Sequence, residues 1–153
     1  MTTRAIAYLK NRDVPFEVIK YDHREKGAAF AARATGFPLE QIIKTLVAEI
    51  GSHNHCLALL PGNRQLDLKK LARIFSVKRA TMVDVAAAER LTGYRVSGIS
   101  PFGTKQRLPV VLDEYVLKYH EIIINAGQRG MMLKMTPQDI VKAIDCEVAA
   151  IAR

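Results

Sequence analysis

A lysine interrupts one of the most apolar segments of the sequence, IIKTLVAEI at residues 42–50. Because side chains alternate between the two faces of a strand, Lys44 shares a face with apolar residues such as Ile42 and Leu46, whereas Thr45 points to the other face. The pattern places Lys44 on the more apolar face. An ammonium group is costly to bury without a partner, so Lys44 either extends past the strand end to solvent or borders a polar pocket. The pattern alone favours the first arrangement and leaves the second open.

A second segment with chemical potential is the loop RVSGISPFGTKQRLPV. Gly98 allows another backbone or a ligand to approach closely, Ser100 supplies a hydroxyl, Pro101 stiffens the turn and Gly103 permits a positive φ. Such a loop can present backbone groups to a ligand, although a plain connection between a helix and a strand would look the same. GISPFGTK is not a P-loop, because its lysine comes one position late and Pro101 removes an amide donor.

Other catalytic and metal-binding patterns are weak or missing. The sequence has no GxSxG, HExxH or GxGxxG motif. His53 and His55 stand beside Cys56, but they fall in a predicted hairpin turn without further ligands nearby. The two cysteines, Cys56 and Cys146, are far apart and lack CxxC spacing, which argues against a disulfide framework and a zinc site. We therefore expect no metal and no cofactor.

Charge is the strongest compositional signal. The chain has 23 Lys and Arg against 15 Asp and Glu, a formal net charge of +8. Lys and Arg contacts to phosphates supply most non-specific affinity for nucleic acids, so the composition suits a polyanionic partner, although a merely basic soluble surface is the alternative. The residues available for phosphate contacts include Arg64, Lys69, Lys70, Arg73, Lys78, Arg79, Lys105, Arg107, Arg129 and Lys134.

Length and hydropathy indicate one domain over residues 1–153. A chain of 153 residues with 49% hydrophobic residues is long enough for one domain with a real core and short for two. No segment approaches the ~18 uninterrupted apolar residues of a membrane span, and charges interrupt the N-terminal MTTRAIAYLKNRD where a signal peptide would be apolar. We expect a cytoplasmic protein without a membrane partner.

The elements that position these residues alternate along the chain. Capping residues and apolar periodicity predict four helices. One begins after Thr2 or Thr3, one ends at Gly36, one runs from Asp84 to Gly93 and one is opened by TPQD. GSHN predicts a hairpin between 42–50 and 55–61. The fold class is α+β, with a mixed, largely antiparallel sheet or open barrel surrounded by helices. The remaining predictions are a helix over 66–75 and strands over 16–21, 108–113, 121–125, 131–135 and around Val148.

The order of several segments resembles a known family. IIKTLV, LLPGNRQLDLKKLA, TGYRVSGISPFGTKQRLPVVLD, INAGQRG and TPQDIVKAI follow one another as in the YbaK/EbsC type of freestanding aminoacyl-tRNA deacylase, a relative of the editing domain inserted in bacterial prolyl-tRNA synthetases. The resemblance runs nearly from end to end, and KTL, GISPFG with its trailing KQR, and AGQRG are its most specific parts.

This resemblance implies a fold, a reaction and a set of site residues. It implies a mixed sheet or barrel with surrounding helices, and hydrolysis of the ester between a wrong amino acid and a tRNA 3′ end, for this branch Cys-tRNA(Pro). It also implies tRNA, and a link to prolyl-tRNA synthetase, as partners. An aminoacyl ester is already activated, so a site that holds it and uses a group of the substrate itself needs no Ser-His-Asp triad. The implied residues are Lys44 as the essential lysine, Gly98, Ile99, Ser100 and Pro101 as the substrate-holding loop, and Tyr21, Thr45 and Asp139 as pocket residues.

Two departures from the family pattern leave the choice of amino acid open. Ser97 stands where many relatives have glycine, and HREKGAAF after Tyr21 fits poorly, which affects the placement of Phe30. A deacylase for alanyl-tRNA or another small amino acid is therefore one alternative. A non-catalytic adaptor that binds tRNA or a synthetase is another.

Overall fold

The helices begin and end at residues with clear capping chemistry in the computed structural model, which describes residues 2–153. Thr3, Asp67, Asp84 and Thr136 each accept a hydrogen bond from a backbone N–H in the first turn of the helix that follows. Gly36 and Gly93 end their helices in the left-handed conformation. These features confirm the predicted helices. They are α1 (Arg4–Asn11), α2 (Ala28–Thr35), α3 (Leu68–Ile74), α4 (Val85–Thr92) and α5 (Pro137–Ala143), with short 3-10 helices at Leu39–Gln41 and Glu114–Lys118.

The strands of residues 2–153 form one mixed sheet in the order β1-β7-β6-β2-β3-β5-β8, with β4 paired to β2. Four pairings are antiparallel (β1–β7, β2–β3, β2–β4 and β6–β7) and three are parallel (β2–β6, β3–β5 and β5–β8). This confirms the mixed α+β architecture. The strands are β1 (Glu17–Lys20), β2 (Ile42–Ile50), β3 (Asn54–Pro61), β4 (Ala80–Met82), β5 (Val110–Asp113), β6 (Ile122–Gln128), β7 (Met131–Met135) and β8 (Cys146–Ala149).

The predicted hairpin is present and carries the site strand. β2 and β3 pair antiparallel from Ile43 opposite Pro61 to Ile50 opposite Asn54. Gly51 has a φ of 66°, a left-handed conformation that glycine adopts at low cost, at the start of the connecting turn. The sequence prediction missed β4, because a three-residue strand shows no usable alternation.

The sheet has a gap beside β2. One edge of β2 pairs with β3 along almost its whole length. The other edge pairs with β6 only at Ile42 and Ile43, and with β4 only from Ala48 to Ile50. Residues 44–47 therefore have no strand partner on this second edge within the described chain, apart from one bond from the Val83 N–H to the Val47 carbonyl (3.4 Å).

The two faces of β2 pack into different apolar clusters. Ile43 and Val47 belong to the main core, whereas Ala48 and Ile50 belong to a second cluster under α3. Between these points the Lys44 side is only half-buried, and Thr45 is buried on the other side. The expectation that Lys44 lies on the more apolar face is therefore wrong at this part of the strand. Sheet twist changes which face of a long strand is covered, and alternation alone does not record that change.

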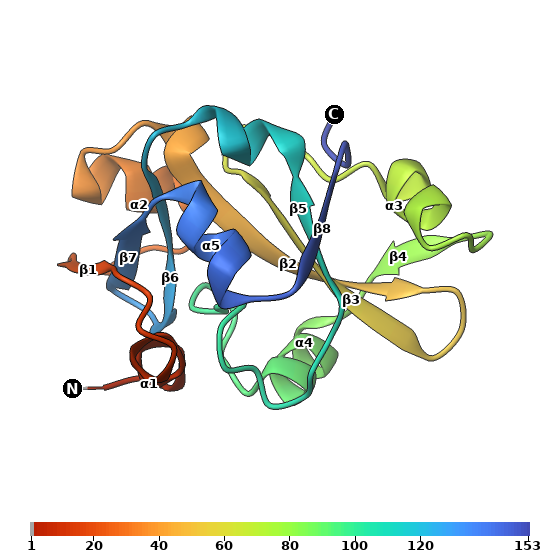
Figure 1. Ribbon diagram of the computed structural model, residues 1–153, viewed down its shortest axis with the longest axis horizontal. Helices are drawn as coiled ribbons and strands as arrows, with labels where there is room; N and C mark the ends of the chain where they lie inside the picture. Colours follow the sequence, from red (N-terminus) through yellow and green to blue (C-terminus); the bar gives the residue numbers. More distant parts are fainter. Residues whose placement is uncertain (1) are drawn as a thin grey trace.

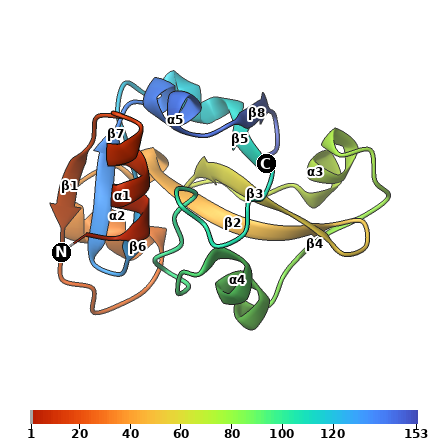
Figure 2. The ribbon, with the colours of Figure 1, turned by 60° about the horizontal axis from the view of Figure 1, so that its bottom comes forward.

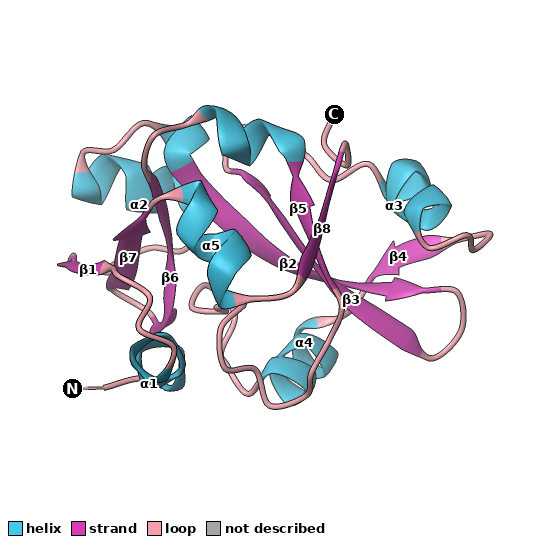
Figure 3. Cartoon of the chain, viewed as in Figure 1, coloured by secondary structure: helices cyan, strands magenta, loops and turns pink. Residues whose placement is uncertain are grey.

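The helices lie around the strands (Figures 1 and 3). α1 and α2 lie at the end of the sheet formed by β1, β7 and β6, whereas α3 and β4 lie toward the opposite end (Figure 1). Figure 2 shows α4 below β2, close to the loop that leads to β5. None of the described helices combines the length and apolar character that a membrane crossing requires.

Candidate active site

A cavity of about 300 Å³ lies at the gap in the sheet. This volume is at the lower end of the range for small-molecule sites. β2 forms one wall with residues 42–47, and the other walls come from the ends of the neighbouring elements. They are Tyr21, His23 and residues 25–28 before and at the start of α2, Ala31, residues 82–85 between β4 and α4, Ala88, Val96, Ser97, Ile99, Asn125, Arg129 and Met132.

β6 opens the gap because it bends away from β2. After Ile124, which pairs with Ile43, the register of β6 against β7 shifts between Asn125 and Gln128. Gly127 in this bulge has a φ of 95°, and a Cβ there would come within 2.7 Å of the Tyr94 ring. A bulge bends its strand and disrupts local pairing. Asn125 is thereby placed at the edge of the cavity rather than in a ladder with β2.

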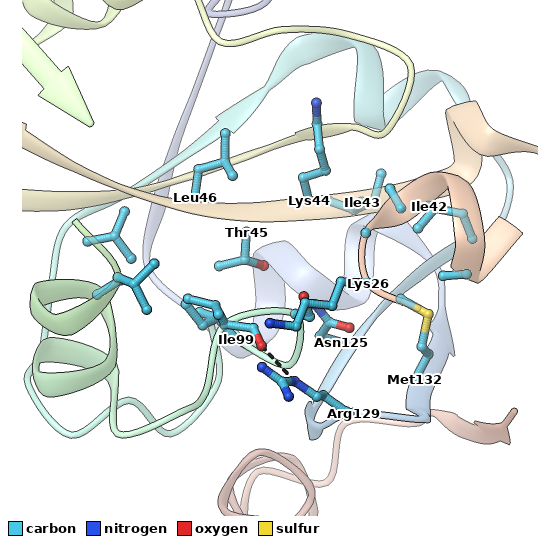
Figure 4. Close-up of a pocket in the computed structure, with 18 of the residues that line it drawn as sticks. Lys26, Ile42, Ile43, Lys44, Thr45, Leu46, Ile99, Asn125, Arg129 and Met132 are labelled. Carbon is cyan, nitrogen blue, oxygen red and sulfur yellow. Dashed lines mark hydrogen bonds between the residues drawn. The ribbon is translucent and has the colours of Figure 1, made fainter. Parts of the chain in front are cut away.

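Thr45 carries an unpartnered polar atom into this cavity. The residue is only 7% exposed, and its hydroxyl has no hydrogen-bond partner among residues 2–153. Figure 4 shows its side chain on the same side of β2 as Lys26, Asn125 and Ile99. Buried hydroxyl groups are nearly always satisfied, because an unpaired one costs on the order of 1–3 kcal/mol. The Thr45 hydroxyl is thus available to a ligand that enters the cavity.

Lys44 extends from the opposite side of β2 (Figure 4). Its ammonium group donates a hydrogen bond to the backbone carbonyl of Arg64. Burial lowers the pKa of Lys44, because a half-buried ammonium loses part of its hydration. Lys44 is among the residues that line the cavity, but its ammonium group lies on the other side of β2, where the Arg64 carbonyl accepts its hydrogen bond.

The substrate-holding loop predicted at Gly98, Ile99, Ser100 and Pro101 lies against the β6–β7 turn. A Cβ at Gly98 would lie 3.2 Å from the Arg129 amide nitrogen, so the close approach at this glycine is to backbone. Ile99 lines the cavity, whereas Ser100 is fully buried and its hydroxyl accepts from the Phe102 N–H (3.2 Å). Pro101 lines a separate hollow with Tyr8 and Arg12.

The backbone conformation of Ser97 explains why a glycine is expected at the loop entrance. Its φ is 69°, in the left-handed region that costs a residue with a side chain about 1–2 kcal/mol. Gly98 donates to the Arg95 carbonyl (3.0 Å) and closes this turn. The serine therefore fits the same backbone path with strain, and its side chain borders the cavity.

Two further predicted residues occupy different positions. Tyr21 lines the cavity, its N–H donates to the Gly130 carbonyl (2.9 Å), and burial raises the pKa of its phenol. Asp139 lies in the first turn of α5, where its N–H donates to the Thr136 hydroxyl (3.2 Å) and its carboxylate accepts from the same hydroxyl (2.9 Å), and it is not among the cavity-lining residues. The Phe30 ring centroid lies 6.3 Å from that of Tyr21, and Phe30 is not among the cavity-lining residues.

Sequence reasoning did not place Lys26, Asn125 and Arg129 at the cavity, although it counted Arg129 among the residues available for phosphate contacts. Arg129 is held by a hydrogen bond from its Nε to the Val96 carbonyl (3.0 Å), and Figure 4 shows it beside Asn125. Asn125 and Arg129 both belong to the INAGQRG segment, one of the segments that carry the family resemblance, so this segment could have pointed to them. Lys26 lies in the segment that fits the family poorly, and nothing in its local pattern marks it as a cavity residue.

The chemistry of the cavity is that of hydrogen-bond donors around a small space. The serine and threonine hydroxyls that form hydrogen bonds within residues 2–153 pair with backbone groups or with Asp139. Thr45, Asn125, Lys26 and Arg129 instead supply donors at the cavity. Preorganised donors of this kind stabilise negative charge that develops on an oxygen atom.

His53, His55 and Cys56 do not converge. His53 lies in the hairpin turn, and His55 and Cys56 are successive residues of β3, so their side chains point to opposite faces. Cys56 is fully buried, and burial raises the pKa of its thiol to about 12. In the part of the chain that is described, no three His, Cys, Asp or Glu residues form a group that could hold a metal ion.

Comparison with known proteins places this chain in a family. The chain matches the aminoacyl-tRNA editing domain over residues 24–143. It is 33% identical to EbsC of Enterococcus faecalis, a candidate Cys-tRNA(Pro)/Cys-tRNA(Cys) deacylase, over 97% of this chain and 92% of the relative. It is 29% identical to the multifunctional Ser/Thr-tRNA deacylase ProXp-y of Escherichia coli, over 98% of this chain and 92% of the relative.

A solved structure shows the same architecture. It is that of a candidate trans-editing enzyme for prolyl-tRNA synthetase, with a TM-score of 0.89 and 28% identity, and it covers 98% of this chain and 95% of that one. The domain match and the relatives that align over nearly the whole length agree with the resemblance seen in the sequence. The chain belongs to the aminoacyl-tRNA editing domain family.

Proposed function

We propose that this protein is a trans-editing hydrolase that removes a wrong amino acid from tRNA, with Cys-tRNA(Pro) as its substrate. The observation that carries this proposal is the unpartnered Thr45 hydroxyl in a small cavity next to Lys44. Family membership and the names of two relatives, a candidate Cys-tRNA deacylase and a Ser/Thr-tRNA deacylase, support the reaction class.

The reaction requires positioning more than a strong protein nucleophile. Water adds to the ester carbon, the bond from that carbon to the ribose oxygen breaks, the ribose oxygen takes a proton from the attacking water, and the amino acid leaves as the free acid. We place the aminoacyl group in the cavity, where Thr45 and Asn125 meet the ester and the amino-acid side chain. Backbone groups of the 98–101 loop hold the terminal ribose from the cavity side, and Lys44 contacts its phosphate from the other side of β2. A group of the substrate, either the cysteine thiol or the free ribose hydroxyl, assists the attack.

The cavity also sets the class of amino acid. A volume of about 300 Å³ suits a small aminoacyl group, and the Thr45 hydroxyl can exchange a hydrogen bond with a thiol or hydroxyl but not with a methyl group. Cysteine therefore fits better than alanine. The Ser/Thr-tRNA deacylase among the relatives makes a hydroxyl-bearing amino acid the second candidate.

Single-turnover deacylation of a panel of mischarged tRNAs tests the proposal. The panel contains Cys-tRNA(Pro), Ser-tRNA and Thr-tRNA, and Ala-tRNA(Pro), each with and without prolyl-tRNA synthetase. We expect Cys-tRNA(Pro) to be cleaved fastest. Faster cleavage of the seryl or threonyl ester would move the substrate to the second candidate. A lack of turnover of every ester would leave the adaptor role.

A further inference from the structure

A basic and aromatic cluster lies on the side of β2 to which Lys44 extends. Its centre is Arg64, whose guanidinium carbon lies 3.6 Å from the centroid of the Tyr115 ring. Lys118 places its ammonium nitrogen 4.2 Å from the same centroid. We call these three residues the Arg64–Tyr115–Lys118 surface. Arg64 and Tyr115 are half-buried, and Lys118 is exposed.

The backbone that carries Arg64 is fixed from three directions. A Cβ at Gly62 would come within 2.7 Å of the Leu39 carbonyl and 2.8 Å of the Ile42 carbonyl, so the loop packs directly on the start of β2. The Arg64 N–H donates to the Pro61 carbonyl (3.0 Å), and the Arg64 carbonyl accepts from the Lys44 ammonium. Arg64 is thereby linked to the candidate catalytic lysine by a direct bond.

Tyr115 is fixed in a similar way. Its N–H donates to the Asp113 carboxylate (3.1 Å). Asp113 is fully buried, and its other carboxylate oxygen accepts the N–H groups of Ile151 (3.0 Å) and Ala152 (3.1 Å). The carboxylate beneath the surface is therefore occupied by backbone donors. The backbone that carries the Tyr115 ring is thus held in place before any ligand arrives.

The arrangement has the chemistry of a binding surface for single-stranded RNA. An arginine plane backed by an aromatic ring offers a flat face on which a nucleobase stacks, and a nearby lysine can contact a phosphate. The neighbouring Glu40 modulates the local charge: burial first and then Glu40 raise the pKa of Tyr119, whereas Arg64 lowers it. Lys44, Arg64 and Lys118 bring three cations to this side of the molecule, against the Glu40 carboxylate and the buried Asp113 carboxylate, which act on Tyr119.

We infer that the Arg64–Tyr115–Lys118 surface binds the unpaired 3′ tail of the RNA, one or more nucleotides before the esterified end. A base of the tail stacks on the Arg64 guanidinium, and Lys118 contacts a phosphate of the same tail. The inference rests on the proposed function, because it places the esterified end at the cavity on the other side of Lys44. A duplex hides the faces of its bases, so this surface reads the tail and not the stem.

The test uses equilibrium binding of uncharged RNA hairpins to the full chain, followed by fluorescence anisotropy. One hairpin ends in an unpaired 3′-ACCA tail and the other is blunt. We expect Arg64→Ala to weaken binding of the tailed hairpin about tenfold and to leave binding of the blunt hairpin unchanged. Arg64→Lys keeps the charge but loses the flat face, so it should lose most of the same affinity. The Arg64 carbonyl persists in both variants, and melting curves check that the fold does too.

The chain supplies a matched control in Arg12. Its guanidinium carbon lies 3.5 Å from the Tyr8 ring centroid, the same kind of stack at the end of α1, away from Lys44. Arg12→Ala should leave binding of both hairpins unchanged. An equal loss for tailed and blunt hairpins in Arg64→Ala, or no loss at all, would overturn the inference. So would a loss of affinity for prolyl-tRNA synthetase alone, which would make the surface a protein contact.

The binding test of the Arg64–Tyr115–Lys118 surface is independent of the deacylation test of the proposed function. If wild-type protein cleaves no aminoacyl ester but Arg64→Ala still weakens tail binding, the deacylase proposal fails and the RNA surface stands. If wild-type protein deacylates tRNA while Arg64→Ala binds the tail normally, the surface is wrong and the deacylase proposal stands.

Discussion

Replacing Thr45 by valine should stabilise the protein and weaken its activity. Valine keeps the shape and β-branching of threonine and removes only the hydroxyl. That hydroxyl lies in a residue that is 7% exposed and has no partner among residues 2–153. A buried, unpaired hydroxyl costs on the order of 1–3 kcal/mol. Water that enters the cavity offsets part of this cost, so we expect a gain of about 1 kcal/mol, which corresponds to a rise in Tm of roughly 2–4 °C for a chain of this size.

The effect on turnover has the opposite sign. If Thr45 exchanges one neutral hydrogen bond with the substrate in the transition state, its loss costs about 0.5–1.5 kcal/mol. We therefore expect kcat/KM for Cys-tRNA(Pro) to fall by up to about tenfold. Thermal melting and single-turnover deacylation of the same preparations measure the two effects together.

Thr92→Val is the matched control. Thr92 is fully buried, and its hydroxyl donates to the Ala88 carbonyl (2.8 Å) and accepts from the Tyr94 N–H (3.1 Å). The same substitution leaves these groups unpaired and should lower stability by about 1–3 kcal/mol. The reasoning would be refuted if both variants lost stability to a similar degree, or if Thr45→Val deacylated Cys-tRNA(Pro) at the wild-type rate.

Three further outcomes follow from the site. Lys44→Met keeps the apolar stem, so it should melt at or slightly above the wild-type temperature while its single-turnover deacylation rate falls about 100-fold or more. Lys44→Arg should lose deacylation activity as well. Near-wild-type rates in both variants would remove Lys44 from the site. Affinity for tRNA should fall steeply with salt, with a log–log slope of about −0.7 per phosphate contacted in a single-stranded tail, and a flat salt titration by anisotropy would contradict the charge-based account. Deacylation should survive exhaustive treatment with EDTA, and loss of turnover that zinc restores would point back to His53, His55 or Cys56.

Local chemistry made much of the fold predictable. Thr3, Asp84 and Thr136 begin their helices because their side chains satisfy free N–H groups, and that signal is complete within four residues of sequence. The β2–β3 hairpin is equally local. The parallel pairings, by contrast, join segments far apart in the chain, and no local pattern specifies them. β4 is too short to show a period.

The site was predictable only where one residue carries the signal. Lys44 is conspicuous because a charge interrupts an apolar run, and Thr45 follows from the family resemblance. Asn125 reaches the cavity only because β6 bulges away from β2, and that bend depends on Gly127 packing against the Tyr94 ring. The orientation of Lys44 toward the Arg64 carbonyl depends on a loop twenty residues away. These are tertiary effects that spacing along the sequence does not contain.

The cavity walls differ in how much they can be changed. β2 pairs with β3 along almost its whole length and with β6 and β4 at its two ends, so the positions of Lys44 and Thr45 are set by the sheet. Residues 22–27, which supply His23, Glu25 and Lys26 to the opposite wall, belong to no helix or strand. Residues 22–27 are therefore the place for directed evolution of a new amino-acid preference. A library that varies residues 22–26 and keeps Gly27, whose φ of 97° favours glycine and whose carbonyl accepts the Ala31 N–H, would leave the hydrogen-bonded frame of the enzyme untouched.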